Sequence, residues 1–391
     1  MIAEPEPAPA LSRDSAPAAP TTPATTATTA TAVRRVESLT GLRFFAAVAV
    51  VLCHVGGSFS FVDHAVVADG YGYVGVTFFF LLSGFVLTWS CTGQAARRFW
   101  WLRISRIWPA ACLMMVFAFT VIADKESIPG PGGHLAELAL VQAWSPDQSV
   151  YFGGNGVEWS LSAELFFYAL FPFAAAGLAR LRGRGLATTA AATLLVLGLV
   201  PLIASTCGLS ASLYYWLFFV FPPYRFGEFL LGMILARAVL LGLRAPRPAL
   251  TASVGAAGAA VVLWSITRYT IESGVLVQRP DVALLFIPFF ALLLWGCVSM
   301  ELAGRRPWLA TKPMLRLGEW SFALYLVHKP TFIFTSRWSW WHNHGGYSAV
   351  LMFAAYLALA VCVAACLCLF VERPIERRLR HLRIGNRPAR V

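Results

Sequence analysis

Ten long apolar stretches follow one another along this chain of 391 residues, and no other feature limits its fold so strongly. A helix needs about 20 predominantly apolar residues to cross a bilayer. Stretches of about this length occupy residues 39–58, 71–90, 107–123, 161–179, 187–205, 212–236, 249–267, 282–301, 317–335 and 347–371. The sequence therefore predicts an all-α, polytopic membrane helix bundle of about ten transmembrane helices.

Two segments depart from this regular pattern. The stretch at 212–236 contains Pro222 and Pro223, and proline lacks the amide hydrogen that a helix interior uses, so we expect a kink or break there. A shorter apolar piece at 135–144 is too short to cross a bilayer. We expect it to lie at the membrane interface or to re-enter.

The composition fits a membrane protein. Hydrophobic residues make up 58% of the chain and charged residues only 13%, against about 25% charged residues in soluble domains. This excludes an ordinary cytosolic enzyme and most disordered proteins. The formal net charge of +12 would indicate nucleic-acid binding only if the charges shared one exposed face.

Basic residues are divided unevenly between the two sets of loops. One set, together with both termini, holds 24 Lys and Arg residues, whereas the opposite loops hold four, along with nine acidic residues. Cytoplasmic loops of membrane proteins carry an excess of Lys and Arg. We therefore expect a multi-pass protein of a bacterial plasma membrane with both termini in the cytoplasm, whose basic surplus orients it.

Composition also divides the chain into three parts. Residues 1–36 form an Ala/Thr/Pro-rich segment, with 10 Ala, 7 Thr and 6 Pro among the first 32 residues. Such a segment buries too little apolar surface to become ordered and lacks the apolar run of a signal peptide. We predict a disordered cytoplasmic tail there, a transmembrane domain at 37–376 and a basic cytoplasmic tail at 377–391.

The sequence contains no pattern typical of a bound cofactor. It has no P-loop and no dinucleotide fingerprint, and its eight cysteines are not spaced with histidines as zinc ligands are. Cys362, Cys366 and Cys368 share the last apolar stretch, where we interpret them as packing residues. We expect no metal and no tightly bound cofactor.

Ionisable side chains inside a bilayer are costly and by default mark a functional site. Those within the apolar stretches are Arg43, His54, Glu164, Arg225, Glu228, His328 and Lys329, with Glu319 near a cytoplasmic end.

Arg43 and His54 share the first stretch. Eleven positions separate them, which is close to three helical turns, so both project from one face about 16 Å apart along the axis. We expect Arg43 just inside the inner leaflet and His54 near the midplane. One helix would then present a cation at the cytoplasmic mouth and a titratable imidazole in the membrane interior.

This spacing, an arginine followed by ten residues and a histidine, resembles the signature of the acyltransferase 3 family of integral-membrane O-acyltransferases. Five further segments resemble motifs of that family in the same order, namely Phe78–Phe85, Arg98–Pro109, Glu158–Tyr168, Leu317–Pro330 and Glu372–Pro374. Together the motifs run from about residue 38 to residue 376.

The resemblance implies transfer of an acyl group from acetyl-CoA or another short-chain acyl-CoA to a hydroxyl of a glycan, a lipid-linked sugar or a secondary metabolite. The first two helices are similar to the actinomycete branch that acylates antibiotics such as macrolides. Many family members carry an additional extracytoplasmic hydrolase-like domain, for which a chain ending at residue 391 has no room. We expect a stand-alone transferase.

An acyl-CoA donor is polyanionic and needs cations at the inner face of the membrane. We assign this role to Arg43 and to the arginines of an expected cytoplasmic loop, Arg97, Arg98, Arg103 and Arg106. The alternative is that the loop arginines only orient the protein.

His54 is the predicted general base, because an imidazole can take the proton of an attacking hydroxyl at neutral pH. We expect the hydroxyl to attack the thioester directly. A covalent acyl-imidazole is the alternative route, and Ser83 in the second stretch stays open as a nucleophile.

The other buried polar residues have two interpretations each. Glu164 orients an imidazole, holds the acceptor or pairs with Arg225, while Arg225 and Glu228, three residues apart, favour a mutual ion pair. His328 is expected at the depth of His54, as a second catalytic group or as a hydrogen-bonded core histidine. The candidates for substrate binding are Ser83, Arg225, Glu228 and Tyr325.

The alternative function is a polytopic transporter or flippase of a polar metabolite. Transporters often show paired broken helices, whereas here only the stretch at 212–236 contains a Pro-Pro break. A structural scaffold would not explain the buried polar residues. The expected partners are therefore membrane lipids, acyl-CoA and a hydroxylated acceptor, without nucleic acid.

Overall fold

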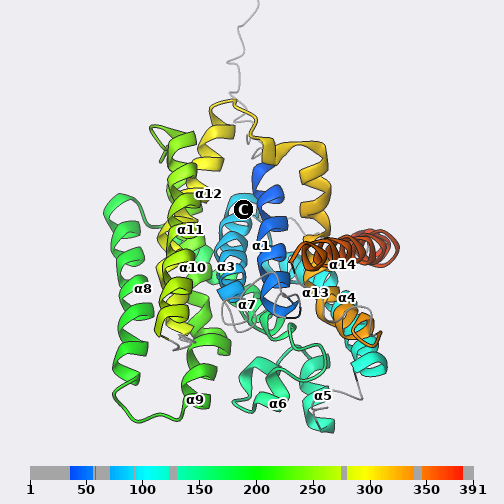
Figure 1. The fold of residues 1–391 in the computed structure, drawn as a ribbon. Coiled ribbons are helices and arrows are strands. Elements are labelled where there is room, and N and C mark those ends of the chain that lie inside the picture. The colour runs from blue at the N-terminus through cyan, green and yellow to red at the C-terminus, as the bar shows by residue number, and fades with distance from the viewer. Residues whose placement is uncertain are drawn as a thin grey trace, which may run out of the picture. The chain divides into compact units, whose positions relative to one another are not determined.

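The computed structural model describes residues 36–55, 58, 71–91, 94–122, 130–273, 280–338 and 346–381. All regular secondary structure within these residues is helical (Figure 1). The predicted tail at 1–36 lies outside the described residues apart from Val36, and so does the predicted basic tail at 377–391 from residue 382 onward.

The described residues contain ten long helices: α1 (Ser38–Val55), α3 (Val74–Ser90), α4 (Ala96–Ile122), α7 (Trp159–Ala179), α8 (Gly183–Ala204), α10 (Pro222–Leu240), α11 (Pro248–Ser273), α12 (Ile287–Leu302), α13 (Lys312–Thr335) and α14 (Gly346–Leu367). Shorter elements connect or extend them: η2 (Tyr71–Tyr73), α5 (Pro131–Leu138), η3 (Gln142–Trp144), α6 (Gln148–Tyr151), α9 (Ala211–Tyr215), η4 (Trp216–Val220), η5 (Pro280–Phe286), η6 (Trp308–Ala310), η8 (Cys368–Glu372) and α15 (Arg373–His381).

Among the described residues, nine helical segments are long and apolar enough to cross a membrane, which confirms the polytopic bundle. They coincide with nine of the ten expected stretches. The tenth, at 317–335, lies in the 24-residue helix α13, whose charged residues make it too polar to qualify by composition. Because α13 packs against α1, α4 and α14, its His328 is buried in protein, whereas Lys312 and Arg316 near its start are exposed. The cytoplasmic location of both termini stays a prediction, and we call the N-terminal end of α1 the inner end.

The helix is interrupted just before Pro222 and Pro223, as expected. Helix α9 continues into a five-residue π-helix, η4, and Phe221 then adopts an extended conformation with ψ of 119°. Pro222 begins α10 at a position where its missing amide hydrogen is not needed. The short piece at 135–144 forms parts of α5 and η3 and does not cross. It is held by hydrogen bonds from Trp108 to Leu138 O and from Trp216 to Ala143 O.

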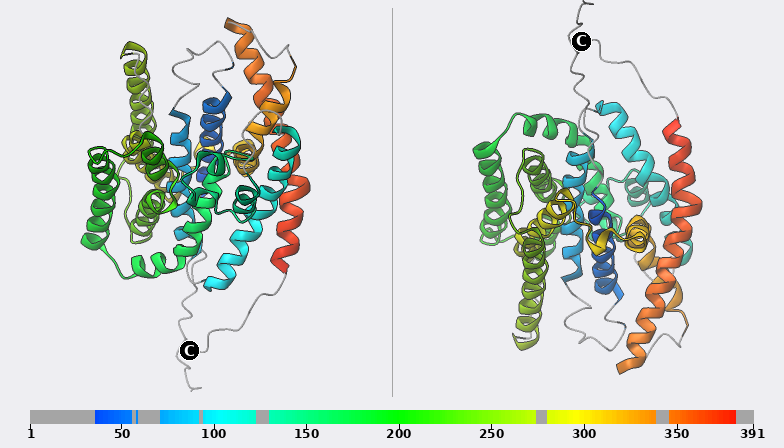
Figure 2. Two further views of the ribbon diagram at one scale, coloured as in Figure 1. Left: turned by 90° about the horizontal axis from the view of Figure 1, so that it is seen from below. Right: turned by 90° about the horizontal axis from the view of Figure 1, so that it is seen from above.

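Helices α1 and α3 run side by side at the centre of both views in Figure 2. Helix α3 packs closely on α10 because small residues face each other. A Cβ added to Gly84 would collide with the carbonyl of Phe229, and one added to Gly232 would collide with the carbonyl of Leu81. The two backbones are therefore in direct contact.

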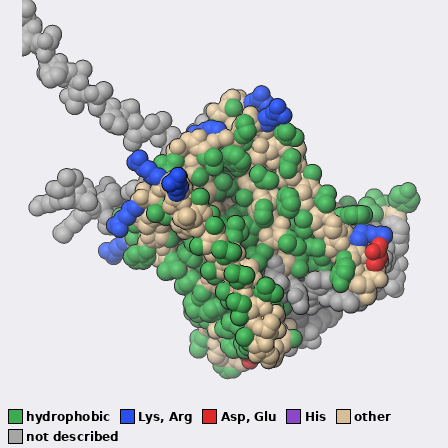
Figure 3. Space-filling view, turned by 90° about the vertical axis from the view of Figure 1, so that its left-hand side faces the viewer, with side chains coloured by type: hydrophobic (Ala, Val, Ile, Leu, Met, Phe, Trp, Pro, Cys, Tyr) green, Lys and Arg blue, Asp and Glu red, His purple; other side chains and the backbone are tan. Residues whose placement is uncertain are grey.

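Burial separates the central helices from the peripheral ones. In the segment Tyr71–Ser90, 72% of the 18-residue apolar stretch that could cross a membrane is buried inside the protein. The corresponding share is only 11% in Pro248–Thr270 and 17% in α8. The face that contains α8 is covered largely by hydrophobic side chains, with Lys and Arg gathered at its margins (Figure 3). Such a surface is suited to lipid contact.

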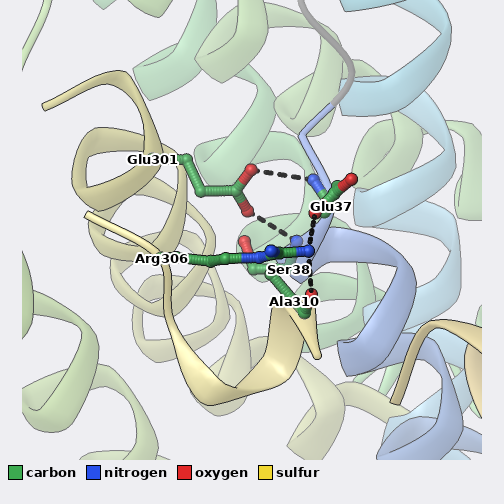
Figure 4. A network of polar contacts seen from close by, with 5 residues as sticks. All are labelled: Glu37, Ser38, Glu301, Arg306 and Ala310. Atoms are coloured by element: carbon green, nitrogen blue, oxygen red, sulfur yellow. Dashed lines mark hydrogen bonds and ion pairs between the residues drawn. The ribbon is translucent and has the colours of Figure 1, made fainter. Parts of the chain in front are cut away.

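A carboxylate from another helix caps the N-terminus of α1 (Figure 4). Glu301, at the end of α12, accepts hydrogen bonds from the amide of Glu37 at 2.9 Å and from the amide of Ser38 at 2.5 Å. Arg306 in turn contacts the Glu37 carboxylate at 3.2 Å and the carbonyl of Ala310. A negative charge at a helix N-terminus satisfies free amides and opposes the helix dipole, so this cluster holds α1 against α12.

We predict that Gly232→Val destabilises the protein by about 1–3 kcal/mol, because the added side chain must push α10 away from α3. Thermal unfolding in detergent measures the effect. Gly198→Val on α8 is the matched control, since a Cβ at this position has no atom within 4 Å. Equal unfolding temperatures for the two variants would contradict the close α3–α10 contact.

Candidate active site

Two histidines from helices far apart in the sequence meet near the outer end of the bundle. Nδ1 of His54 on α1 lies 3.1 Å from Nε2 of His328 on α13. His328 is fully buried, whereas His54 is exposed. The described part of α1 ends at Val55, and the expected mid-membrane depth of His54 stays a prediction. His328 lies at the level of His54, as expected.

Hydrogen bonds to carbonyl groups assign the tautomers of the neutral pair. Nδ1 of His54 is 3.0 Å from Val50 O, and Nδ1 of His328 is 3.2 Å from Leu324 O. A carbonyl oxygen only accepts, so each Nδ1 carries its hydrogen. Nε2 of His328 is then the acceptor facing His54. Nε2 of His54 has a lone pair that none of the hydrogen bonds seen among the described residues uses.

Tyr356 and Lys329 also act on the histidine pair. The hydroxyl of Tyr356 on α14 donates to the carbonyl of His328 at 2.6 Å. The ammonium group of Lys329 interacts electrostatically with both imidazoles, and a Cβ on Gly156 would lie 3.0 Å from its nitrogen. Sequence reasoning flagged Lys329 only as a buried charge and missed Tyr356, which stands in an apolar helix with no distinguishing pattern.

Tyr325 connects this end of α13 to the segment before α7. Its hydroxyl donates to Val157 O at 2.8 Å and lies 2.7 Å from the hydroxyl of Ser160. The side chain is buried. In this structure the hydroxyl of Tyr325 joins two parts of the protein, and its expected role in substrate binding stays a prediction.

A second polar cluster lies toward the inner end, about 16 Å from His54 along α1. Arg43 interacts electrostatically with Glu164 and Tyr168 on α7 and with Arg103 on α4. Ser83 on α3 donates to Glu164 at 3.1 Å. Glu164 therefore belongs to the inner cluster, and the ion-pair partner of Arg225 is a different residue.

Ser83 and His54 do not form a nucleophile–base pair. Gly75 of α3 packs on Ala46 and Val50 of α1, and Ser83 lies eight residues, or about 12 Å, further toward the inner end. His54 lies in the opposite direction along α1. The hydroxyl of Ser83 is thus too distant for His54 to activate it.

The arginines expected in a cytoplasmic loop lie on a helix. Helix α4 begins at Ala96, so Arg97, Arg98, Arg103 and Arg106 occupy its first three turns and not a loop. Local helix propensity accounts for the difference, since arginine is a good helix former. Arg97, Arg98 and Arg106 are exposed, and Arg106 interacts with Arg43.

The expected ion pair between Arg225 and Glu228 is present. Arg225 Nη1 lies 2.9 Å from Glu228 Oε1, and both side chains are almost completely buried. The hydroxyl of Thr77 on α3 accepts from Arg225 at 3.2 Å and donates to Glu228 at 3.3 Å. The guanidinium also packs on the rings of Phe80, Trp159 and Phe219. Their complete burial makes direct substrate contact by Arg225 or Glu228 unfavourable without rearrangement.

A pair of buried acids lies beside the histidine level, and sequence reasoning did not single it out. The side-chain amide of Asn155 donates to Glu158 at 3.0 Å and to Leu326 O at 3.0 Å. The backbone N–H of Asn155 donates to the carboxylate of Glu137 at 3.1 Å. Gly154, with φ of +55°, leaves room for the Glu137 carboxylate, which a Cβ would strike. Burial raises the pKa of Glu137 to about 7, and burial together with the charge of Glu137 raises the pKa of Glu158 well above its usual value.

Comparison with known proteins identifies related sequences. A family model described as an acyltransferase domain matches residues 36–369. Acyltransferase MdmB of Streptomyces mycarofaciens is 32% identical over 371 residues, which cover 88% of this chain and 92% of that protein. No solved structure matches the chain.

More distant relatives are longer than this chain. O-acetyltransferase OatA of Staphylococcus aureus is 25% identical, and the putative peptidoglycan O-acetyltransferase YrhL of Bacillus subtilis is 27% identical, each across 88% of this chain. The matched region spans only 58% and 55% of their respective lengths. All of these names describe acyl transfer, which favours that activity over the transporter or flippase alternative.

We predict that Arg225→Met destabilises the protein by about 3–5 kcal/mol, because it leaves the Glu228 carboxylate buried without its counter-ion. The double variant Arg225→Met/Glu228→Met removes both charges and should recover much of this loss. Denaturation in detergent measures both changes. A double variant that is less stable than the single one would show that the ion pair is not the main contribution.

We predict that Glu137→Gln makes stability less dependent on pH. The pKa of Glu137 in the folded protein is about 7, above its ordinary value of 4.5. The native state therefore binds more protons than the unfolded state between these values, and stability falls as pH rises from 4.5 to 7. In the variant, the stability difference between pH 5 and pH 8 should shrink by on the order of 3 kcal/mol.

Unfolding at the two pH values tests this, with Glu272→Gln at an exposed position of α11 as the control. An unchanged pH dependence in Glu137→Gln would contradict the prediction.

Proposed function

Because this chain belongs to the acyltransferase 3 family of integral-membrane O-acyltransferases, we propose that it transfers an acyl group from acyl-CoA to a hydroxyl, with His54 as the general base. The observation that carries the proposal is the histidine pair. His328 holds the ring of His54 from the buried side. The lone pair of His54 Nε2 is thereby directed away from that contact, where a substrate hydroxyl can meet it.

The proposed reaction is a direct transfer. Nε2 of His54 takes the proton of the acceptor hydroxyl as its oxygen bonds to the thioester carbonyl carbon. The tetrahedral oxyanion collapses, the carbon–sulfur bond breaks, and the CoA thiolate takes the proton from the imidazolium. The products are an ester and CoA, and the enzyme returns to its starting protonation state. The positive charge of Lys329 beside the pair favours a developing oxyanion.

The distribution of positive charge supports a donor that enters from the inner end. Arg43 lies on the same helix face as His54 about 16 Å away, and the arginines of α4 adjoin it. Phosphates bound at these guanidinium groups would let an extended pantetheine arm follow α1 toward His54. We propose acetyl-CoA or another short-chain acyl-CoA as the donor.

The proposed acceptor is a hydroxyl of a glycan, a lipid-linked sugar or a secondary metabolite such as a macrolide. The exposure of His54 near the outer end would admit an acceptor larger than the donor's acyl group. The relatives named O-acetyltransferases support an oxygen acceptor and an acetyl group. The bacterial plasma membrane is the proposed location.

We predict that His54→Ala lowers the rate of CoA release by about 10²–10⁴-fold, the usual contribution of a general base. Purified protein in detergent is given labelled acetyl-CoA and a panel of hydroxylated glycans, lipid-linked sugars and macrolides. Cys53→Ala, one residue earlier on α1, is the matched control. Equal rates of CoA release for His54→Ala and the wild type would refute the role of His54.

Two further measurements separate the alternatives. Incubation with labelled acetyl-CoA in the absence of acceptor should leave no label on the protein, and label on His54 would instead establish an acyl-imidazole route. In sealed vesicles, movement of the acceptor across the membrane without CoA release would favour a transporter.

A further inference from the structure

Helix α15 lies beside α4, although more than 250 residues separate the two helices in sequence (Figure 2). The π-helix η8 leads the chain from α14 into α15. Arg373 Nη2 then contacts Glu319 Oε2 at 2.7 Å. Trp101 of α4 donates its indole hydrogen to Leu379 O at 3.2 Å. The ion pair joins α15 to α13, and the indole hydrogen bond joins it to α4, the helix that carries the inner arginines.

The two helices together gather arginines at the inner end. Seven are present within the described parts of α4 and the first turns of α15: Arg97, Arg98, Arg103, Arg106, Arg373, Arg377 and Arg378. Three acids adjoin them, Glu319, Glu372 and Glu376. Arg373 is engaged by Glu319, and Arg106 interacts with Glu372. The acids therefore leave an excess of four positive charges on this surface.

The charge on α15 faces solvent. Arg377 and Arg378 are exposed, whereas Leu379 is half-buried and its backbone carbonyl accepts the hydrogen bond from Trp101 of α4. A polyanion could thus reach both guanidinium groups without displacing any of the contacts that hold α15. Concentrated like charges of this kind raise the local concentration of anionic ligands.

This charged surface is continuous with the interior of the bundle. Arg103 and Arg106 both act electrostatically on Arg43 of α1, which also interacts with Glu164 and Tyr168 of α7. The positive groups therefore extend from α15 across α4 to α1. Such a series matches an extended ligand with phosphates at one end and an uncharged arm that enters the bundle. A lipid headgroup at the periphery would not require the inward continuation.

We propose that Arg377 and Arg378 of α15 bind the ribose 3′-phosphate of a CoA donor, an inference that rests on the proposed function. The diphosphate leads directly to the pantetheine arm, so it belongs near the arginines of α4 and Arg43. The ribose phosphate lies at the opposite end of the donor and meets the outermost guanidinium groups, which are on α15. Guanidinium groups bind phosphate with bidentate, charge-assisted hydrogen bonds.

The test measures equilibrium binding of CoA and of 3′-dephospho-CoA to the full chain in phosphatidylcholine nanodiscs. The variant Arg377→Gln/Arg378→Gln should bind CoA about tenfold or more weakly, while its affinity for 3′-dephospho-CoA stays that of the wild type. The matched control is Arg182→Gln/Arg184→Gln, which removes two exposed arginines near the start of α8 on the same predicted side. The control should preserve both affinities. Unfolding temperatures confirm that each variant is folded.

Other outcomes overturn the inference. An unchanged CoA affinity in the α15 variant, or an equal loss in the control variant, excludes a phosphate site on α15. An equal loss for CoA and 3′-dephospho-CoA places the effect away from the 3′-phosphate. If the loss of CoA affinity appears only when phosphatidylglycerol is added, α15 binds lipid headgroups instead. A wild-type protein that binds CoA and releases it from acetyl-CoA keeps the proposed function whatever the α15 variant does.

Discussion

The buried guanidinium of Arg225 imposes the strongest constraint on this bundle. A charge enclosed by protein is tolerated only with a counter-ion and further hydrogen bonds. Glu228 supplies the first and Thr77 of α3 the second, while Trp159 of α7 covers one side of the group. One side chain on α10 therefore fixes the relative positions of three helices. The close contact of α3 with α10 at Gly232 reinforces the same arrangement, and α1 packs on the surface that results.

Helix α1 is held at both ends by residues from other helices. Glu301 of α12 binds its first amides, and His328 of α13 meets His54 in its last turn. Arg43 lies between these anchors and faces α4 and α7. The distance between the inner cation and the outer imidazole is thus set by a rigid helix of fixed rise. That rigidity is what a transferase needs if the anionic part of a donor and its thioester are to be bound at separate places.

The sequence alone was sufficient for the class of fold and for several polar residues. Apolar length predicted the crossing helices, Pro222 predicted the break before α10, and helical spacing predicted the Arg225–Glu228 pair. It failed at one helix boundary and where the answer depended on other helices. The arginines near Arg98 were assigned to a loop, because a basic run before an apolar stretch has the same composition in a loop and in a helical first turn.

What the sequence by itself determined was therefore local: which segments are helical and apolar, and which charges lie within them. Only the tertiary structure decided the partners. It paired His54 with His328, gave Glu164 to Ser83 rather than to Arg225, and placed Glu137 with Asn155. Each of these pairs joins residues from different helices or loops. Their contacts depend on how helices cross and rotate against one another, which small residues such as Gly232 and buried charges control.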